Sequence, residues 1–291
     1  MAIKAKILTY SVLFIIASLI IACGNERPVE TAKTEVVSED TLSTDEMMAV
    51  TYTLPSPLQI ASIFKKSGLK YQEDLTSKQK DPANYMTNMS KALNLGVYSA
   101  DLSYALLNKQ NQTAMEYMKL SRQIAGYLGI GSVYEVNDIA KRFEQNIGTE
   151  DSLTVIISEL QMEMDFYLDE NNQQEITAIA FAGAWIESMY IASEVNKKTK
   201  QKKLNKKFAA QMEILESILN ALKVGEKHEP EIRAMRESLQ KIQNNYEGFP
   251  SVKRVKNADE ETEKIELSDD ELALLSKEIT ALRWKFVNGE F

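Results

Sequence analysis

Apolar residues recur three and four positions apart along most of the chain beyond residue 55, with charged and polar residues between them. This spacing gathers the apolar side chains on one face of an α-helix. No segment alternates apolar and polar residues beside a hairpin turn, as a half-buried strand would. The pattern predicts an all-α protein with helices at about 57–67, 82–108, 111–128, 132–147, 149–168, 176–195, 204–222, 230–246 and 268–286.

The segment 176–195 differs from the others because it is apolar on most sides and rich in alanine. Helices that are apolar all round are buried, so we expect this one at the centre of the fold. Short turns between the helices favour a multi-helix antiparallel bundle. The alternative is an array of αα-hairpins of the tetratricopeptide type, although no segment repeats at a fixed period.

The first 22 residues carry another pattern. Lys4 and Lys6 precede an almost uncharged stretch from residue 7 to residue 22, which is the order of charge and apolarity in a secretory signal. The stretch is shorter than the ~20 residues of a spanning helix. It ends with the small Ala22 directly before Cys23, the only cysteine. This ending resembles the lipobox of bacterial lipoproteins; an uncleaved anchor or an ordinary signal peptide are the alternatives.

The lipobox resemblance implies a location in the bacterial cell envelope. Residues 1–22 would be removed as a signal peptide, and Cys23 would carry the lipid as the new N-terminus. Several acyl chains on one cysteine hold a protein firmly to a membrane. The residue after Cys23 is Gly24 and not an aspartate, which fits sorting to the outer membrane. The expected partner of the N-terminus is therefore a membrane, reached through the lipid on Cys23.

The mature chain divides into a tether and one folded domain. Residues 23–54 are polar, with little periodicity, and bury too little apolar surface to offset the entropy of ordering. We therefore expect a lipidated cysteine and a disordered tether over 23–54, followed by a single helical domain over 55–291. Within that domain the charged segment at about 250–267 is predicted to be a mobile loop.

Charge and composition exclude several classes of function. The formal net charge of −8 becomes −10 without the two lysines of the signal, which opposes binding to nucleic acid. The chain holds one histidine, His228, in a predicted turn, and one cysteine that is assigned to the lipid. Zinc sites need several thiolates or imidazoles. A nucleophilic triad would have to use His228 as its base, and we expect this residue to be a surface residue of the turn instead. No glycine-rich phosphate loop is present, and we expect no metal and no cofactor.

Two predicted helices contain carboxylates among apolar residues. Asp101 lies near Tyr104 in one helix, and Glu187 interrupts the most apolar helix between Trp185 and Tyr190. A carboxylate in such a place must be paired or hydrogen-bonded. If the two helices meet, these five residues form a polar and aromatic pocket for a ligand. The alternative is that each carboxylate stabilises the core by bonding to neighbouring groups.

A second candidate surface is basic. Seven lysines fall between residues 197 and 207 of an otherwise acidic protein, and those that open the following helix oppose its dipole. Such a segment suits an anionic lipid surface or an acidic partner protein of the envelope. The alternative is an ordinary solvated loop. The residues assigned to this surface are Lys200, Lys202, Lys203, Lys206 and Lys207.

The runs at 93–104 and 183–187, together with the lipobox and the tether, resemble a group of uncharacterised helical lipoproteins of Bacteroidetes-type bacteria. The resemblance implies no activity. Exported lipoproteins of that group often carry acidic residues after the cysteine; residues 24–28 lack such a run, which favours a domain facing the periplasm. We expect a non-catalytic binding or scaffolding module; the alternative is a small-ligand receptor or a carboxylate-based enzyme that uses Asp101 and Glu187.

Overall fold

The computed structural model describes residues 54–223, 225, 229–258 and 260–291. The predicted signal peptide, the lipidation of Cys23, the tether up to residue 53 and the turn at His228 lie outside the described residues. The described residues all belong to one compact unit of the chain.

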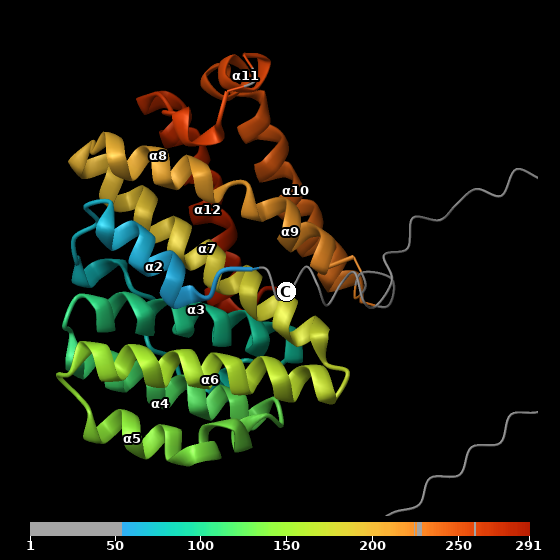
Figure 1. Ribbon diagram of the computed structural model, residues 1–291. Coiled ribbons are helices and arrows are strands. Elements are labelled where there is room, and N and C mark those ends of the chain that lie inside the picture. Colours follow the sequence, from blue (N-terminus) through green and yellow to red (C-terminus); the bar gives the residue numbers. More distant parts are fainter. Residues whose placement is uncertain (1–53, 224, 226–228, 259) are drawn as a thin grey trace, which may run out of the picture. The chain divides into compact units, whose positions relative to one another are not determined.

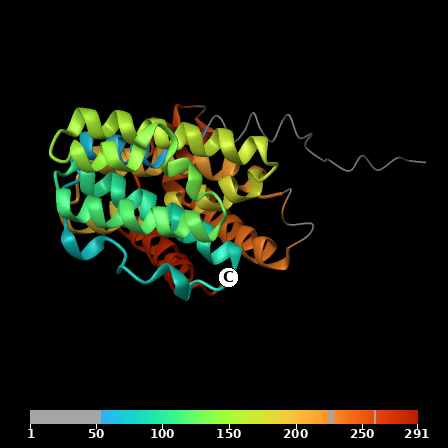
Figure 2. The ribbon, with the colours of Figure 1, turned by 90° about the horizontal axis from the view of Figure 1, so that it is seen from below.

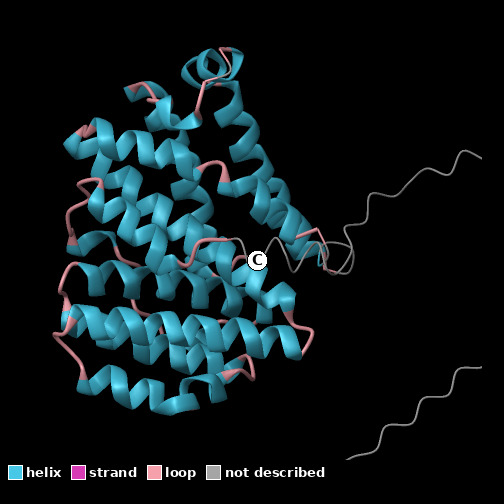
Figure 3. Cartoon of the chain, in the orientation of Figure 1, coloured by secondary structure: helices cyan, strands magenta, loops and turns pink. Residues whose placement is uncertain are grey.

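The described residues form helices joined by turns and short 3-10 segments, and they contain no strand (Figure 3). The all-α prediction is therefore confirmed. The helices are α2 (Pro57–Lys66), α3 (Asn88–Leu107), α4 (Asn111–Tyr127), α5 (Ile139–Gln145), α6 (Glu150–Glu170), α7 (Gln174–Thr199), α8 (Lys202–Gln211), α9 (Ile214–Ala221), α10 (Pro230–Gly248), α11 (Pro250–Asn257) and α12 (Asp269–Asn288).

Helix α7 is the central element of the bundle (Figure 1). It packs against α3, α12, α2, α8, α9 and α6. In a hairpin array each unit contacts only its neighbours in sequence, so these contacts define a bundle around one helix. Its length and apolar composition would suit a membrane span, but 72% of its most apolar window is buried within the fold. The prediction that this segment is the central helix is confirmed.

Glycine allows α3 and α7 to cross in close contact. A Cβ atom added at Gly96 of α3 would lie 1.7 Å from the carbonyl oxygen of Ala180, and one added at Gly183 of α7 would lie 2.1 Å from that of Leu93. Both distances are far below van der Waals contact. The backbones of the two helices therefore touch, and any side chain at either glycine would separate them.

Four stretches differ from the predicted elements. The helix predicted over 132–147 is two 3-10 turns followed by α5, because Asn137 and Asp138 have positive φ. The helix predicted over 204–222 is divided into α8 and α9.

The helix predicted from residue 82 begins at Asn88, because Thr87 caps it by accepting a hydrogen bond from the Ser90 amide, while Pro82–Asn84 forms only a 3-10 turn. The loop predicted over 250–267 is wrong in its first half, which is helix α11. Pro250 stands at its first position, and Val252 and Val255, three residues apart, are buried.

The segment between α2 and α3, residues 67–87, is largely irregular; we call it the strap. Figure 2 shows the strap running along one edge of the helices beside α12. The side-chain amine of Lys80 donates to the carbonyl oxygen of Val287 at 2.8 Å and to the amide oxygen of Asn288 at 2.7 Å. The first part of the helical unit is thus tied to its last helix.

Candidate functional site

Glu187 is fully buried in α7 and pairs with Arg283 of α12. The guanidinium donates from Nε to one carboxylate oxygen at 2.6 Å and from Nη2 to the other at 2.7 Å. This two-point geometry is the strongest form of an arginine–carboxylate pair. The side chain of Arg283 is only 14% exposed. Both oxygens of Glu187 are thus occupied by one buried cation.

Arg283 makes two further contacts from the same position. Its guanidinium carbon lies 4.0 Å from the centre of the Tyr190 ring, within the distance at which a cation is attracted to an aromatic face. Its Nη2 also donates to the carbonyl oxygen of Leu75 in the strap at 3.4 Å. One arginine thereby joins α7, α12 and the strap.

Asp101 of α3 is also fully buried. It contacts the strap at Ser77, whereas Arg283 contacts it at Leu75. The Ser77 amide donates to Asp101 Oδ2 at 3.0 Å, and the Ser77 hydroxyl donates to the same oxygen. Tyr117 of α4 donates its hydroxyl to the Ser77 carbonyl oxygen at 2.6 Å. Burial, and then the nearby charge of Glu187, raise the pKa of Asp101 well above its usual value; the bonds from Ser77 act in the opposite direction. Ser77 and Asp101 together fix the middle of the strap.

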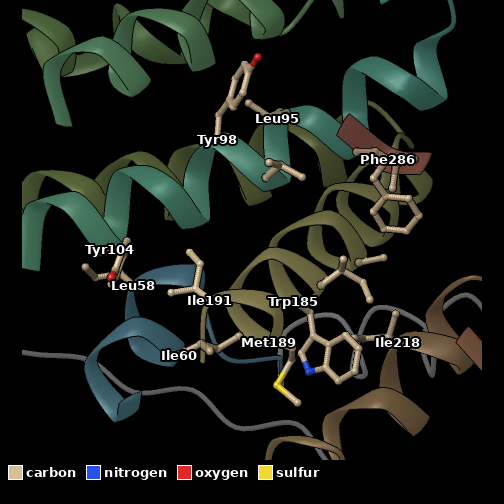
Figure 4. Packing of buried hydrophobic residues seen from close by; sticks show 14 of the residues in the cluster. Leu58, Ile60, Leu95, Tyr98, Tyr104, Trp185, Met189, Ile191, Ile218 and Phe286 are labelled. Atoms are coloured by element: carbon tan, nitrogen blue, oxygen red, sulfur yellow. The ribbon is translucent and has the colours of Figure 1, made fainter. Parts of the chain in front are cut away.

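Tyr104 and Trp185 also belong to the predicted pocket, but the structure places them apart from each other. The Tyr104 hydroxyl donates to the Lys70 carbonyl oxygen at 3.0 Å and accepts from the Gln72 amide at 2.8 Å, so it also holds the strap. Trp185 instead donates its ring N–H to the Gln211 carbonyl oxygen at 3.2 Å. Figure 4 shows Trp185 beside Met189 and Ile218, away from Tyr104.

The structure thus divides the five predicted residues into groups with structural contacts. Glu187 and Tyr190 meet Arg283, Asp101 and Tyr104 bond to the strap, and Trp185 packs elsewhere. The alternative interpretation, in which the carboxylates stabilise the core, matches this geometry. Glu187 is bonded through both carboxylate oxygens, whereas Asp101 is bonded through Oδ2 and its Oδ1 is buried without a hydrogen-bond partner among the described residues.

Arg283 was missed by sequence reasoning, although the chain contains a signal for it. Ile279 and Phe286 are buried positions on the inward face of α12. Arg283 lies four residues after the first and three before the second, so it falls on the same face. A cation at such a position is the expected partner for a carboxylate buried in another helix.

The predicted basic surface is largely neutralised within the chain. Lys200 pairs with Asp269 at 2.5 Å, Lys202 with Glu266 at 3.5 Å and Lys207 with Glu263 at 2.6 Å. These acids come from the charged segment that precedes α12 and from its first turn. The lysines of the basic segment and the acids of this segment therefore form ion pairs with each other.

The remaining two lysines of that surface differ. Lys203 donates its amine to the carbonyl oxygen of Lys66 at 2.9 Å, at the end of α2. Lys206 forms no ion pair within the part of the chain that the structure describes. The charges of Lys203 and Lys206 are thus not balanced by an acid among the described residues, and the role of this surface in binding a partner stays a prediction.

A narrow cavity lies among α3, α6 and α7, with the start of α2 at its edge. Its volume is about 70 Å³, and its walls include Leu95, Asp165 and Phe181. Gln161 donates to Asp165 at 2.9 Å, and burial raises the pKa of Asp165 to about 6.

Helix α6 presents an apolar line to solvent that sequence reasoning missed. The exposed fractions are 55% for Val155, 62% for Met162 and 56% for Phe166; we call these three residues the α6 stripe. At ~100° per residue they lie within about 20° of one direction around the helix. The sequence could have revealed this stripe, because the segment has apolar residues on two helix faces and only one of them can face the core.

Acidic residues border the α6 stripe on both sides. Helix α6 contains seven acidic residues and neither lysine nor arginine. On a helical wheel, six of them lie within about 80° of the stripe. These are Asp151, Glu159, Glu163, Asp165, Asp169 and Glu170.

No protein family, curated protein or solved structure matches this chain. Among the described residues, no group of three or more histidine, cysteine, aspartate or glutamate side chains is arranged to hold a metal ion. The function must therefore be inferred from the geometry of this chain alone.

Proposed function

We propose that the chain is a membrane-anchored lipoprotein of the bacterial cell envelope that acts as a non-catalytic binding or scaffolding module. In this proposal Cys23 carries the lipid, the residues after it form a tether, and the helical domain faces the periplasm from the outer membrane. The lipobox resemblance supports the anchor. The α6 stripe is the observation that supports a binding role.

The α6 stripe favours binding because its side chains are aligned as well as exposed. Single exposed apolar residues are ordinary on a protein surface and need no explanation. Val155, Met162 and Phe166 instead lie on one helix face, two turns and then one turn apart, and are each more than half exposed. Amphipathic helices that bind other proteins display their apolar anchors at this spacing.

A small-ligand receptor or a carboxylate-based enzyme has weaker support. Such a site would use Asp101 and Glu187, yet Glu187 bonds through both oxygens to Arg283 and Asp101 bonds to Ser77. If Glu187 turned toward a ligand, the buried Arg283 would be left as an uncompensated charge, which is strongly unfavourable; if Asp101 did so, the buried Ser77 amide would lose its acceptor. These two residues are better suited to holding the fold than to binding a ligand.

The proposal predicts that Cys23→Ala removes the protein from the membrane. Mass spectrometry of the wild-type protein should find acyl groups on Cys23, because the thiol is the attachment point. Membrane fractionation should find the variant in soluble fractions or as an uncleaved precursor. Cross-linking in living cells should then capture a partner with the wild type and lose it with the variant.

Ser38→Ala, in the same predicted tether, is the matched control and should fractionate with the wild type. An unacylated Cys23 would contradict the anchor. A wild-type protein that cross-links to no partner would contradict the binding role, whatever the state of the lipid.

A further inference from the structure

We infer that the α6 stripe is a docking surface for a basic amphipathic helix of a partner protein. The inference deepens the proposed function, on which it rests, by assigning it a surface and the chemistry of its partner. It depends on three observations: the exposure of the stripe, its helical spacing, and the sign of the charges around it.

The spacing of the stripe determines the shape of the partner. Val155, Met162 and Phe166 extend over three turns of α6, which at ~1.5 Å per residue is about 16 Å. An elongated apolar line of this length matches the apolar face of one helix lying along it. The flexible side chain of Met162, at its centre, can adapt to different apolar side chains.

The acidic border determines the charge of the partner. Glu150 pairs with Lys65 at 3.0 Å, Glu159 pairs with Arg142 at 2.6 Å, and Asp169 accepts from Gln174 at 3.0 Å. The negative charge offered to a partner is therefore that of Asp151, Glu163 and Glu170. Glu170 is exposed at the end of the helix, where a negative charge opposes the helix dipole. The stability of α6 therefore does not explain the acid at this end. Lysine or arginine on the partner would complement it.

The same charges disfavour two other occupants. A second copy would place one acidic α6 against another, and like charges across an interface are unfavourable. An anionic lipid surface attracts basic segments rather than acidic ones. A positively charged helix with an apolar face is the occupant that satisfies both the stripe and its border.

The direct test uses the full chain in phosphatidylcholine nanodiscs and a fluorescent 20-residue peptide of leucine and lysine, with the leucines at helical spacing. Fluorescence anisotropy should report binding in the micromolar range above that of empty nanodiscs. The same peptide with glutamate in place of lysine should not bind. Binding should weaken as salt is added, because the charges at the rim are exposed.

Substitutions on α6 test whether the peptide binds at the α6 stripe. Met162→Ala with Phe166→Ala should weaken binding at least tenfold without a change in melting temperature, because both side chains are exposed. Glu163→Gln with Glu170→Gln should weaken it several-fold and reduce its salt dependence. The matched control is Leu274→Ala with Trp284→Ala on α12, side chains of similar exposure at 58% and 55%, and it should bind within twofold of the wild type.

Three results would overturn the inference: no binding of the basic peptide, equal loss in the α6 and α12 variants, or self-association of the wild type that the α6 variant abolishes. Cross-linking in cells separates this failure from failure of the proposed function. A partner captured equally by the wild type and the α6 variant would leave the binding role intact and reject this surface. A chain that captures no partner would reject the binding role itself.

Discussion

Glu187 and Arg283 form the most buried ion pair within the described part of the chain. Two ions removed from water lose hydration, and only close geometry with further bonds compensates for that loss. Here the two-point contact, the Tyr190 ring and the Leu75 carbonyl oxygen supply those bonds. The pair therefore matters less for its own attraction than for the damage caused when one member is removed.

Removing either member should destabilise the protein strongly. We expect Glu187→Gln and Arg283→Met each to lower the free energy of unfolding by about 3–5 kcal/mol, because a buried charge is left without its partner. The double variant should lose less than the sum by at least about 2 kcal/mol. Urea unfolding of all four proteins measures this difference. Strictly additive effects would show that the two side chains act independently.

At the scale of elements, the crossing of α3 and α7 depends on two glycines. Glycine is unfavourable inside a helix, by roughly 0.5–1 kcal/mol relative to alanine. Both glycines nevertheless stand near the middle of long helices, at the place where each meets the carbonyl oxygens of the other. The close approach of the two backbones explains this local departure from helix propensity.

Gly96→Ala should therefore lower stability although alanine favours helix. We expect a loss of about 2–3 kcal/mol, typical of an overpacked core. Gly126→Ala in α4 is the matched control, since an added Cβ there meets no atom within 4 Å; it should be neutral or stabilising by up to about 1 kcal/mol. Thermal unfolding followed by circular dichroism compares the two. Equal effects would show that the crossing does not limit stability.

Elements with strong local signals could be predicted from the sequence. Pro230 opens α10, and Ser268 caps α12 with Glu271 three residues later, as expected. Helix α11 could not be found by the same reasoning, because its apolar face holds only two valines among charged residues. Short helices of this kind are stabilised by the residues they pack against in the fold, and those residues cannot be identified from the local sequence.

The candidate site was less predictable than the fold. Burial of Asp101 and Glu187 follows from their apolar neighbours in sequence. Their partners do not, because Ser77 and Arg283 lie 24 and 96 residues away along the chain. Periodicity describes one helix at a time, whereas the pairing of charges depends on which helices meet.

At the scale of the whole molecule, buried acids make stability depend on pH. The pKa of Asp165 is about 6 in the folded chain, against an ordinary value of about 4. The folded state therefore binds more protons than the unfolded state between these values. The stability that this carboxyl contributes is fully present below about pH 4 and is lost as the pH rises through 6. Asp101 acts with the same sign.

Asp165→Asn should remove the contribution of this carboxyl to the pH dependence of stability. Relative to the wild type, the variant should gain about 1–2 kcal/mol of unfolding free energy between pH 4 and pH 7, because an amide has no proton to lose. Urea unfolding of both proteins at several pH values measures the change. A difference between variant and wild type that is the same at pH 4 and pH 7 would contradict it.

The position of Arg283 also sets an order of events during synthesis. Helices α3 and α7 leave the ribosome well before residue 283, so for that interval Glu187 has no cation to meet. The core cannot close around an uncompensated carboxylate without a large penalty. We therefore expect the nascent chain to wait for α12 before its two central helices lock together.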